Sequence, residues 1–393
     1  MQDQELYERR EQTLVKHYIL RHYLKRFAHI VAHKWRSITY IDCFAGPWNA
    51  RSPDLRDSSF SIALDELRNA RNTHGQSGRK IELRCCFLEQ NREAYSQLRA
   101  FADGVTDAEV CALNGRFEDS VTQIVDFVRA RRETFPFVFI DPTGWNGFAL
   151  NTISPLLRLN PGEILVNFMT GHIRRFLRDE NSQQSFIRLF GSADFKAQVA
   201  SLSGLALEDA AVSEYIRSLR REGRYQYVLP AVVLHPEIDR THFHLIYATH
   251  HPKGVEVFKE IEKRAMAQME QVRAAAQSRR REERTGQGSL FGTDEAPEGA
   301  YYNDLRGHYL RDSRERVLNL LRRSGWAAYD DVWACALGSP LVWEADLKDW
   351  IEEWRHAGEL RLEGLQGGDR VPKRGRSHCL RWLGQVDRAT SST

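Results

Sequence analysis

TYIDCFAGPW, residues 39–48, is an apolar run that leads into an acidic, glycine-containing turn. The run predicts a buried strand that ends at Asp42, where the turn begins. Trp48 stands where a second glycine would make the turn a typical nucleotide loop. The stretch is therefore either a cofactor site or a plain strand end, and the strands that follow it decide between the two.

The composition is that of a globular protein with more than one domain: 393 residues, 42% hydrophobic and 28% charged. No apolar run approaches the ~18 residues that span a bilayer, and MQDQELYERREQ at the start lacks the features of a signal peptide. We expect a cytoplasmic protein with no membrane partner. The six cysteines form no C-x-x-C pair, so neither a metal site nor a disulfide framework is predicted.

Short apolar runs alternate with helical segments after an N-terminal helical stretch, 1–37. The runs are SITYIDCF, IELRCCFLE, EVCALN, FPFVFIDP and EILVNFM. Alternation of this kind predicts an α/β fold, a Rossmann-like parallel sheet with helices on both faces. We place this domain at 38–271, with a helical insertion at about 170–224. The later runs YQYVLPAVVLH and HFHLIYATHH predict an antiparallel hairpin added to the sheet.

The last quarter of the chain has a different pattern. Residues 272–300 are rich in Arg, Gln, Gly and Glu, which predicts a basic linker. Three helical segments and a hairpin follow, which predicts a winged-helix-like domain at 301–385. Its third helix is acidic and suits a protein partner better than a groove walled by phosphates, so the basic hairpin tip GGDRVPKRGR is the better candidate for nucleic acid.

Polar residues stand at the ends of four predicted strands. They are Asp42, Glu89, Asn114 and the pair Asp141-Pro142. Because right-handed crossovers bring the carboxyl ends of parallel strands to one edge, these residues should converge on a single crevice where ligands bind.

The chemistry of the residues narrows the choice of cofactor for such a crevice. A dinucleotide needs G-x-G-x-x-G, and the first turn offers only Gly46. S-adenosylmethionine has no phosphate, and carboxylates can hold its cationic tail and its ribose diol. We predict Asp42 for the tail and Glu89 for the diol, with Phe44, Gly46 and Asn114 completing the cofactor site.

The segment FVFIDPTGW is similar to the acid-proline-proline-aromatic tetrapeptide of amino-methyltransferases. There the acid and a carbonyl accept hydrogen bonds from an exocyclic NH₂ and orient its nitrogen, and the aromatic ring stacks on a flipped base. This predicts Asp141 and Pro142 as acceptors and Trp145 as the stacking surface. For substrate binding we predict Asn167, Arg174 and Arg175, since arginine forks suit phosphates.

Plainer interpretations exist for each of these residues. Asp42 can cap a helix or form an Asx-turn, Glu89 can be a solvated residue at a helix start, and Asp141-Pro142 can simply end a strand with Trp145 in the core. Asn114 belongs to Asn-Gly, a common turn pair, and the two arginines can lie on a solvated helix face. The cofactor interpretation depends on several of these residues occurring together, each at the end of a successive strand.

The chain resembles the three-Cys-motif partner (TcmP) proteins, a bacterial group with a methyltransferase-like domain and a C-terminal winged-helix-like region. The resemblance spans nearly the whole chain, in the order KHYILRHYL (16–24), YIDCFAGP (40–47), FLEQN (87–91), FIDPTGW (139–145), NFMTGHIRRF (167–176), LFGS (189–192) and HFHLIYATHHPKG (242–254). It implies a three-cysteine-motif protein as partner, and a Rossmann-like methyltransferase fold.

Two functions remain open at this point. The first is an S-adenosylmethionine-dependent methyltransferase that N-methylates a nucleobase in nucleic acid. The second is a non-catalytic interaction subunit that keeps the fold and has lost the cofactor. Trp48 supports the second, because a bulky ring can occupy the methionine pocket.

Overall fold

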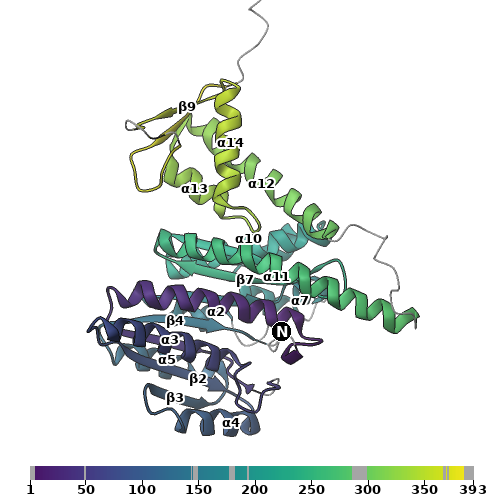
Figure 1. Cartoon of the computed structure of the whole chain (residues 1–393). Helices are drawn as coiled ribbons and strands as arrows, with labels where there is room; N and C mark the ends of the chain where they lie inside the picture. The colour runs from purple at the N-terminus through teal and green to yellow at the C-terminus, as the bar shows by residue number, and fades with distance from the viewer. Residues whose placement is uncertain are drawn as a thin grey trace, which may run out of the picture. The chain divides into compact units, whose positions relative to one another are not determined.

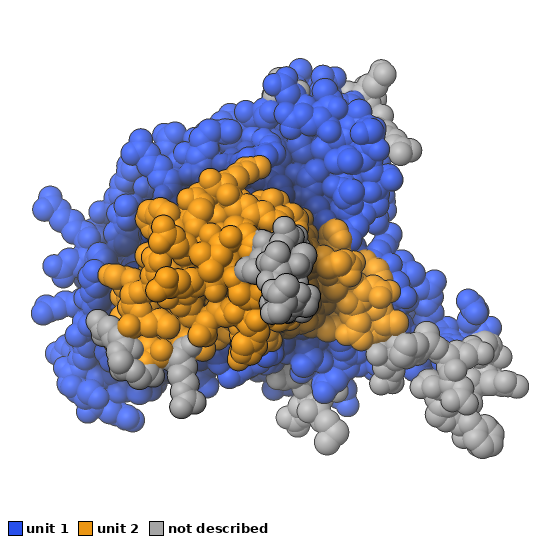
Figure 2. All heavy atoms as spheres, turned by 90° about the horizontal axis from the view of Figure 1, so that it is seen from above, with its two compact units in different colours: residues 1–293 blue, residues 294–393 orange. Residues whose placement is uncertain are grey.

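A computed structural model of the chain describes residues 5–47, 50–142, 144, 149–176, 182–192, 194–285, 299–365, 369 and 371–384. It divides into two compact units, residues 1–293 and 294–393 (Figure 2). Each unit is described by itself below. No helix in the described ranges is both long enough and apolar enough to cross a membrane.

The first unit is built on a seven-stranded sheet in the order β3-β2-β1-β4-β5-β7-β6. The strands are β1 (Ser37–Asp42), β2 (Glu82–Glu89), β3 (Glu109–Asn114), β4 (Thr134–Ile140), β5 (Glu163–Phe168), β6 (Tyr227–Leu234) and β7 (Thr241–Thr249). β1 to β5 are parallel, and β7 runs antiparallel to both of its neighbours. The predicted mostly parallel α/β sheet is confirmed, as is the antiparallel hairpin at its end.

Helices cover both faces of the sheet. On one face α2 (Glu11–Ala32) packs against both α3 (Ser59–Gln76) and α11 (Pro252–Thr285) (Figure 1). α5 (Phe117–Arg129), α6 (Leu150–Leu157) and α10 (Gly204–Gly223) belong to the core of the other face. The strands bury side chains on both sides, which explains why they appear in the sequence as continuous apolar runs.

The remaining described helices of this unit follow β2 and β5. α4 (Arg92–Asp103) follows β2, with its first turn capped by the Asn91 side chain. Three short helices precede α10 in the insertion between β5 and β6: α7 (Thr170–Phe176), α8 (Gln183–Phe190) and α9 (Phe195–Gln198).

Part of the predicted linker 272–300 is helix. Residues 272–285 are the last turns of α11, and 286–298 lie outside the described residues. Arg273 is 5% exposed and donates to the His235 carbonyl and, at 2.6 Å, to Asp239. The polar composition of residues 272–300 predicted a linker, but Arg273 is bound into the fold. The neighbouring Val272 and Ala276 are buried as well.

The second unit contains three longer helices and a small sheet. The helices are α12 (Ala300–Ser324), α13 (Tyr329–Leu337) and α14 (Glu344–His356), and the strands are β8 (Trp326–Ala328), β9 (Leu360–Glu363) and β10 (Cys379–Trp382). The antiparallel sheet has the order β8-β10-β9, so the last strand lies in the middle. Trp333 and Tyr329 are fully buried in the core of this unit.

Candidate functional site

The carboxyl ends of β1, β2 and β4 meet at one edge of the large sheet. β1 ends at Asp42 and β2 at Glu89, as predicted, and Asp141 follows the last residue of β4. The backbone of the turn after β1 is held from both sides, because the Cys43 N–H donates to the Phe139 carbonyl at 3.0 Å and the Ala45 N–H to the Leu88 carbonyl at 2.8 Å. The turn is therefore a fixed part of the sheet edge.

A cleft of about 900 Å³ opens at this edge. Its walls come from the turn after β1, the ends of β2 and β4, and the first turns of α4 and α5. The lining comprises Cys43, Phe44, Leu88, Glu89, Gln90, Asn91, Glu93, Ala94, Gln97, Gly115, Arg116, Phe117, Glu118, Asp141, Pro142 and Gly144. Three predicted strand ends thus contribute to one crevice.

Glu89 lines this cleft and is 8% exposed. One oxygen, Oε1, accepts the Asn91 N–H at 2.6 Å, and the Asn91 side chain in turn caps α4 through the N–H groups of Glu93 and Ala94. A carboxylate has about four acceptor positions, so one backbone donor fixes its orientation and leaves capacity for a ligand's hydroxyl groups.

The other predicted cofactor residues differ in position. Phe44 lines the cleft and packs against Phe117, with ring centroids 5.3 Å apart. Gly46 lies in the turn but is not among the lining residues. Asn114 does not line the cleft either: its Nδ2 donates to the Glu89 carbonyl at 2.9 Å and so ties the end of β3 to β2.

Asp42 does not face the cleft, contrary to the role predicted for it. Its side chain is fully buried and accepts hydrogen bonds from the Ser59 hydroxyl at 2.6 Å and the Phe44 N–H at 3.2 Å. The carboxylate therefore joins the turn to the start of α3. The sequence places Asp42 correctly at the strand end but does not show that the side chain turns inward.

Asp141 lies at the cleft between two partners from distant parts of the chain. Lys16 of α2 forms an ion pair with its Oδ2, and the Asn167 Nδ2 of β5 donates to Oδ1 at 2.7 Å. The side chains of Lys16 and Asp141 are 12% and 15% exposed, so the ion pair is largely shielded from water. Asn167 was predicted to bind substrate, and the structure places it against Asp141. The sequence analysis missed Lys16, although it opens the segment KHYILRHYL.

The surroundings of the two carboxylates at this edge differ. Burial raises the pKa of Asp42, the nearby Asp141 carboxylate adds to the rise, and the hydrogen bonds from Ser59, Phe44 and Tyr40 oppose it, so that the pKa is about 6. The Asp42 side chain is fully buried. Asp141 has the ammonium of Lys16 beside it.

The remaining predicted catalytic residues are only partly described. Pro142 lines the cleft and is buried. Trp145 lies outside the described residues, as do Thr143 and Trp48. Both tryptophan roles, stacking for Trp145 and obstruction for Trp48, remain predictions.

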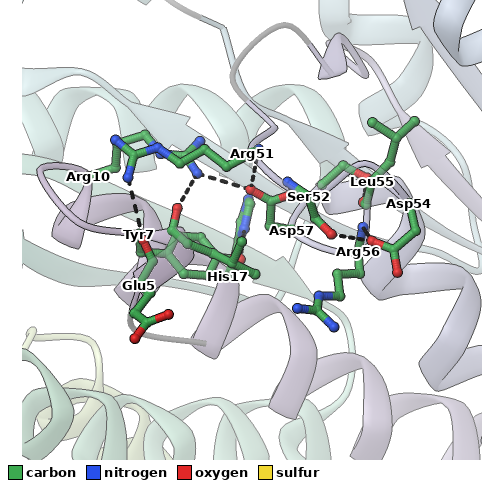
Figure 3. A network of polar contacts seen from close by, with 12 residues as sticks. Glu5, Tyr7, Arg10, His17, Arg51, Ser52, Asp54, Leu55, Arg56 and Asp57 are labelled. Carbon is green, nitrogen blue, oxygen red and sulfur yellow. Dashed lines mark hydrogen bonds and ion pairs between the residues drawn. The ribbon is translucent and has the colours of Figure 1, made fainter. Parts of the chain in front are cut away.

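Figure 3 shows a polar network at the start of α2. Lys16 belongs to the same helix. The buried Asp57 carboxylate accepts from the Arg10 guanidinium at 3.0 Å and from the N–H groups of Arg51 and Ser52 at 2.9 and 3.1 Å. Within the same network Tyr7 contacts His17 Nδ1 at 2.9 Å. Residues before α2 are thus tied to the loop that follows the cleft turn.

The predicted arginines lie in the insertion, in α7. Arg174 donates to Glu208 of α10 at 3.0 Å, and Glu208 is 4% exposed, so this arginine is partly engaged inside the unit. Arg175 is exposed, and both arginines line a hollow of about 680 Å³ with Lys196 of α9. Since α7 begins two residues after β5 ends, this hollow belongs to the same edge of the sheet as Asn167.

His244 of β7 anchors the first residue of α7. The Thr170 hydroxyl lies 3.2 Å from its Nδ1, and burial lowers the pKa of His244 to about 3. A neutral, buried histidine has a structural role at this position. Within the ranges that the structure describes, no group of three or more His, Cys, Asp or Glu side chains could hold a metal ion.

Comparison with known proteins gives only distant structural likenesses. No family model and no curated protein matches the sequence. A crystal structure of protein LPL1258 from Legionella pneumophila, of the family DUF519, is 12% identical with a TM-score of 0.37, over 62% of this chain and 87% of that one. A loganic acid methyltransferase with SAH is 8% identical with a TM-score of 0.28, over 68% and 87% of the two chains. At these values neither likeness indicates what this chain binds or does.

Proposed function

We propose that the protein is an S-adenosylmethionine-dependent methyltransferase that acts on a nitrogen of a nucleobase. The observation that carries the proposal is the shared cleft, which places the Glu89 carboxylate and Asp141 around one volume of about 900 Å³. That volume lies within the range of small-molecule sites. The strand order, with antiparallel β7 between β5 and β6, supports it as an analogy at the level of the fold.

The residues of the cleft fit the cofactor chemically. Glu89 keeps acceptor capacity for a ribose diol, and Phe44, Leu88 and Phe117 offer apolar surface for an adenine. The bound cofactor supplies an electrophilic methyl group. The buried Asp42 holds the turn and is not assigned to the cationic tail.

Asp141 is the residue that orients the methyl acceptor. Lys16 and Asn167 each hold one of its oxygens, which fixes the plane of the carboxylate. Its remaining acceptor positions can take an N–H of an exocyclic amine and so direct the nitrogen lone pair, a positioning effect. Pro142 and, beyond the described residues, Trp145 complete this acceptor region, and Arg174 and Arg175 are assigned to the substrate's phosphates.

The proposal also covers a partner protein and the second unit. The order of its elements, helix-strand-helix-helix-strand-strand, supports a winged-helix-like module. The resemblance to three-Cys-motif partner proteins supports a three-cysteine-motif protein as the partner. Co-purification of the two proteins from cells that express both is the direct test of that pairing.

A non-catalytic interaction subunit is the second candidate. The ion pair favours it, because the Lys16 ammonium already satisfies one oxygen of Asp141, the carboxylate that the amine would use. The two candidates differ in one measurable property, methyl transfer to nucleic acid.

Cofactor binding is tested first by isothermal titration calorimetry with S-adenosylmethionine. We expect saturable binding, weakened about 10-fold or more in Glu89→Gln, since an amide accepts fewer hydrogen bonds than a carboxylate and its NH₂ would face the Asn91 N–H. Asp126→Asn, at an exposed position of α5, is the matched control and should bind like the parent. Saturating cofactor that produces neither heat nor a thermal shift would refute the enzyme proposal.

A further inference from the structure

The sheet of the second unit carries a row of exposed side chains across all three of its strands. In the register of the sheet Trp326 of β8 pairs with Arg381 of β10, and Arg381 pairs with Arg361 of β9. Paired residues in neighbouring strands point to the same face. We call this face, marked by Trp326, Arg381 and Arg361, the outer face.

The opposite face of the same sheet is the packed one. Leu380 pairs with Ala327 and Leu362, and Leu380 is fully buried. Trp382 lies edge-on to Trp354 of α14, with ring centroids 6.0 Å apart. The sheet therefore places its core on one side and leaves the outer face to solvent.

The exposure of the outer face is large for the residues concerned. Trp326 is 59% exposed, the highest value among the exposed large hydrophobic residues, and Leu383, two residues after Arg381, is 55% exposed. The Arg381 side chain is 58% exposed. Exposed tryptophan is uncommon on a surface that has no partner, because the indole is among the largest apolar side chains.

The charge on this face is unbalanced. Arg361 and Arg381 stand directly opposite each other, and like charges in that position destabilise a sheet. Glu363 compensates in part, with an ion pair to Arg381 at 3.3 Å. Arg323, exposed in the last turn of α12, adds another positive charge close in sequence to Trp326.

Part of the acidic α14 is engaged within the unit. It pairs with α12, through Asp346 with Arg306 at 2.7 Å and Glu353 with Arg314 at 2.6 Å. Asp349 and Glu352 of the same helix are exposed, so the suitability of this helix for a protein partner stays a prediction.

Parts of the hairpin tip, the better sequence candidate for nucleic acid, contact other residues of the unit where the tip is described. Lys373 pairs with Asp369 at 2.6 Å, Arg374 lies over the Trp333 ring at 5.4 Å, and the Gly375 N–H donates to Asp330. Lys373 and Arg376 of the tip are nevertheless exposed. The outer face differs in that its exposed arginines stand in register with an exposed tryptophan.

We propose that the outer face binds single-stranded nucleic acid, with a base stacked on Trp326 and the flanking phosphates bound by Arg361 and Arg381. An unpaired base has a π-face that an exposed indole can cover, and stacking of this kind contributes about 1–3 kcal/mol per base. A polyanion also relieves the repulsion between the two opposed arginines. A flat sheet suits a splayed single strand, whereas a duplex hides its base faces.

Fluorescence anisotropy of a labelled 12-nucleotide oligo-dT or oligo-U, added to the full chain, tests the proposal. Trp326→Ala should raise Kd by about 5-fold or more, and Trp326→Phe should recover part of the loss, since stacking contributes ~1–3 kcal/mol. The double variant Arg361→Gln with Arg381→Gln should raise Kd further. It should also reduce the slope of log K against log salt by about 1 to 1.5, as each phosphate contact on a single strand contributes ~0.7.

The controls separate this surface from the cleft. Lys348→Gln, on α14 with its side chain 40% exposed, removes one positive charge elsewhere in the unit and should leave Kd unchanged. Affinity for S-adenosylmethionine should be the same in every variant, so this proposal and the methyltransferase proposal fail independently. Equal Kd values for the parent, Trp326→Ala and the double arginine variant would overturn the proposal. So would a poly-glutamate peptide that competes as well as the oligonucleotide, because the surface would then suit an acidic protein.

Discussion

Two carboxylates lie on opposite sides of the large sheet, one where its parallel strands end and one where they begin. The same helix, α2, contacts both. Asp141 follows β4 at the carboxyl edge and pairs with Lys16, whereas Glu163 opens β5 at the other edge and accepts from the Tyr23 hydroxyl at 2.6 Å. The first carboxylate lies at a cleft and has a cation as partner. The second is buried among hydroxyl groups.

The surroundings of Glu163 are those of a structural cluster. The Thr249 hydroxyl donates to its other oxygen at 2.8 Å, and the Tyr247 hydroxyl contacts that of Tyr23. Burial raises the pKa of Glu163, and the hydrogen bonds from these hydroxyls oppose the rise. Gly254 leaves the space that this cluster needs, since a Cβ there would overlap the Tyr247 hydroxyl.

The two carboxylates differ in their access to a cleft and in the charge of their partners. A strand end, a helix contact and low exposure are common to both sites. An ammonium partner and an adjoining cleft occur at Asp141 alone of the two. We therefore expect changes at Asp141 to affect turnover, and changes at Glu163 to affect stability.

Asp141→Asn should produce the largest effect, a loss of about 10²- to 10³-fold in kcat for methyl transfer. The amide loses acceptor capacity for the substrate amine and cannot form the ion pair with Lys16. Incorporation of labelled methyl groups into cellular RNA and DNA measures the rate, and calorimetry should show cofactor affinity within about threefold of the parent. Methyl transfer by the variant at the parent rate would mean that Asp141 is only a strand end. No transfer by the parent itself, with cofactor bound, would favour the non-catalytic subunit.

Glu163→Ala should lower the free energy of unfolding by about 3 kcal/mol and leave kcat of the folded enzyme unchanged. The change strands the hydroxyls of Tyr23 and Thr249 in a buried site and opens a cavity. Urea unfolding measures the loss. Glu260→Ala, at a side chain 42% exposed on α11, is the control and should stay within about 0.5 kcal/mol of the parent. Equal losses for the two variants would show that the hydroxyl cluster contributes little.

Asp42→Asn tests the role of the third carboxylate through the pH dependence of stability. The pKa of this carboxyl is about 6 in the folded protein, against an ordinary value of 3.8. Between these values the folded chain retains a proton that the unfolded chain has lost, so stability falls as pH rises from about 4 to 6 and the full loss persists above 6. We expect Asn to remove about 2 kcal/mol of this loss, since the amide oxygen can still accept from the Phe44 N–H while the amide NH₂ donates to the Ser59 hydroxyl oxygen. Unfolding curves at pH 4.5 and 7.5 measure it, and parallel pH dependence in parent and variant would contradict the assignment.

The strand ends of the large sheet could be predicted from the sequence because parallel strands buried on both faces appear as apolar runs with abrupt polar ends. Asp42, Glu89 and Asn114 are the last residues of their strands, as expected. The direction of each side chain could not be predicted, since the same strand end can face a cleft, as at Glu89, or the interior, as at Asp42.

The sequence also could not predict which residues of distant segments contact a site residue. Lys16 is 125 positions from Asp141, and nothing in an amphipathic helix identifies which polar residue will meet a strand end. Arg273 shows the opposite error: a polar segment resembled a linker, although the guanidinium binds carbonyl oxygens that only the folded chain supplies.

Tyr23→Phe should have the smallest effect and gives the sharpest comparison, because Lys16 lies seven residues earlier on the same helix. Removing the hydroxyl deprives Glu163 of one donor and should lower the free energy of unfolding by about 1 kcal/mol, with kcat unchanged. Lys16→Gln is the matched variant at the other edge, and it should reduce kcat about 10-fold or more while cofactor affinity is retained, because Asp141 loses the cation that orients it. A lower kcat in Tyr23→Phe would mean that α2 transmits changes along its length. In that case the two edges of the sheet would form one functional unit, and the separate roles assigned to them would be wrong.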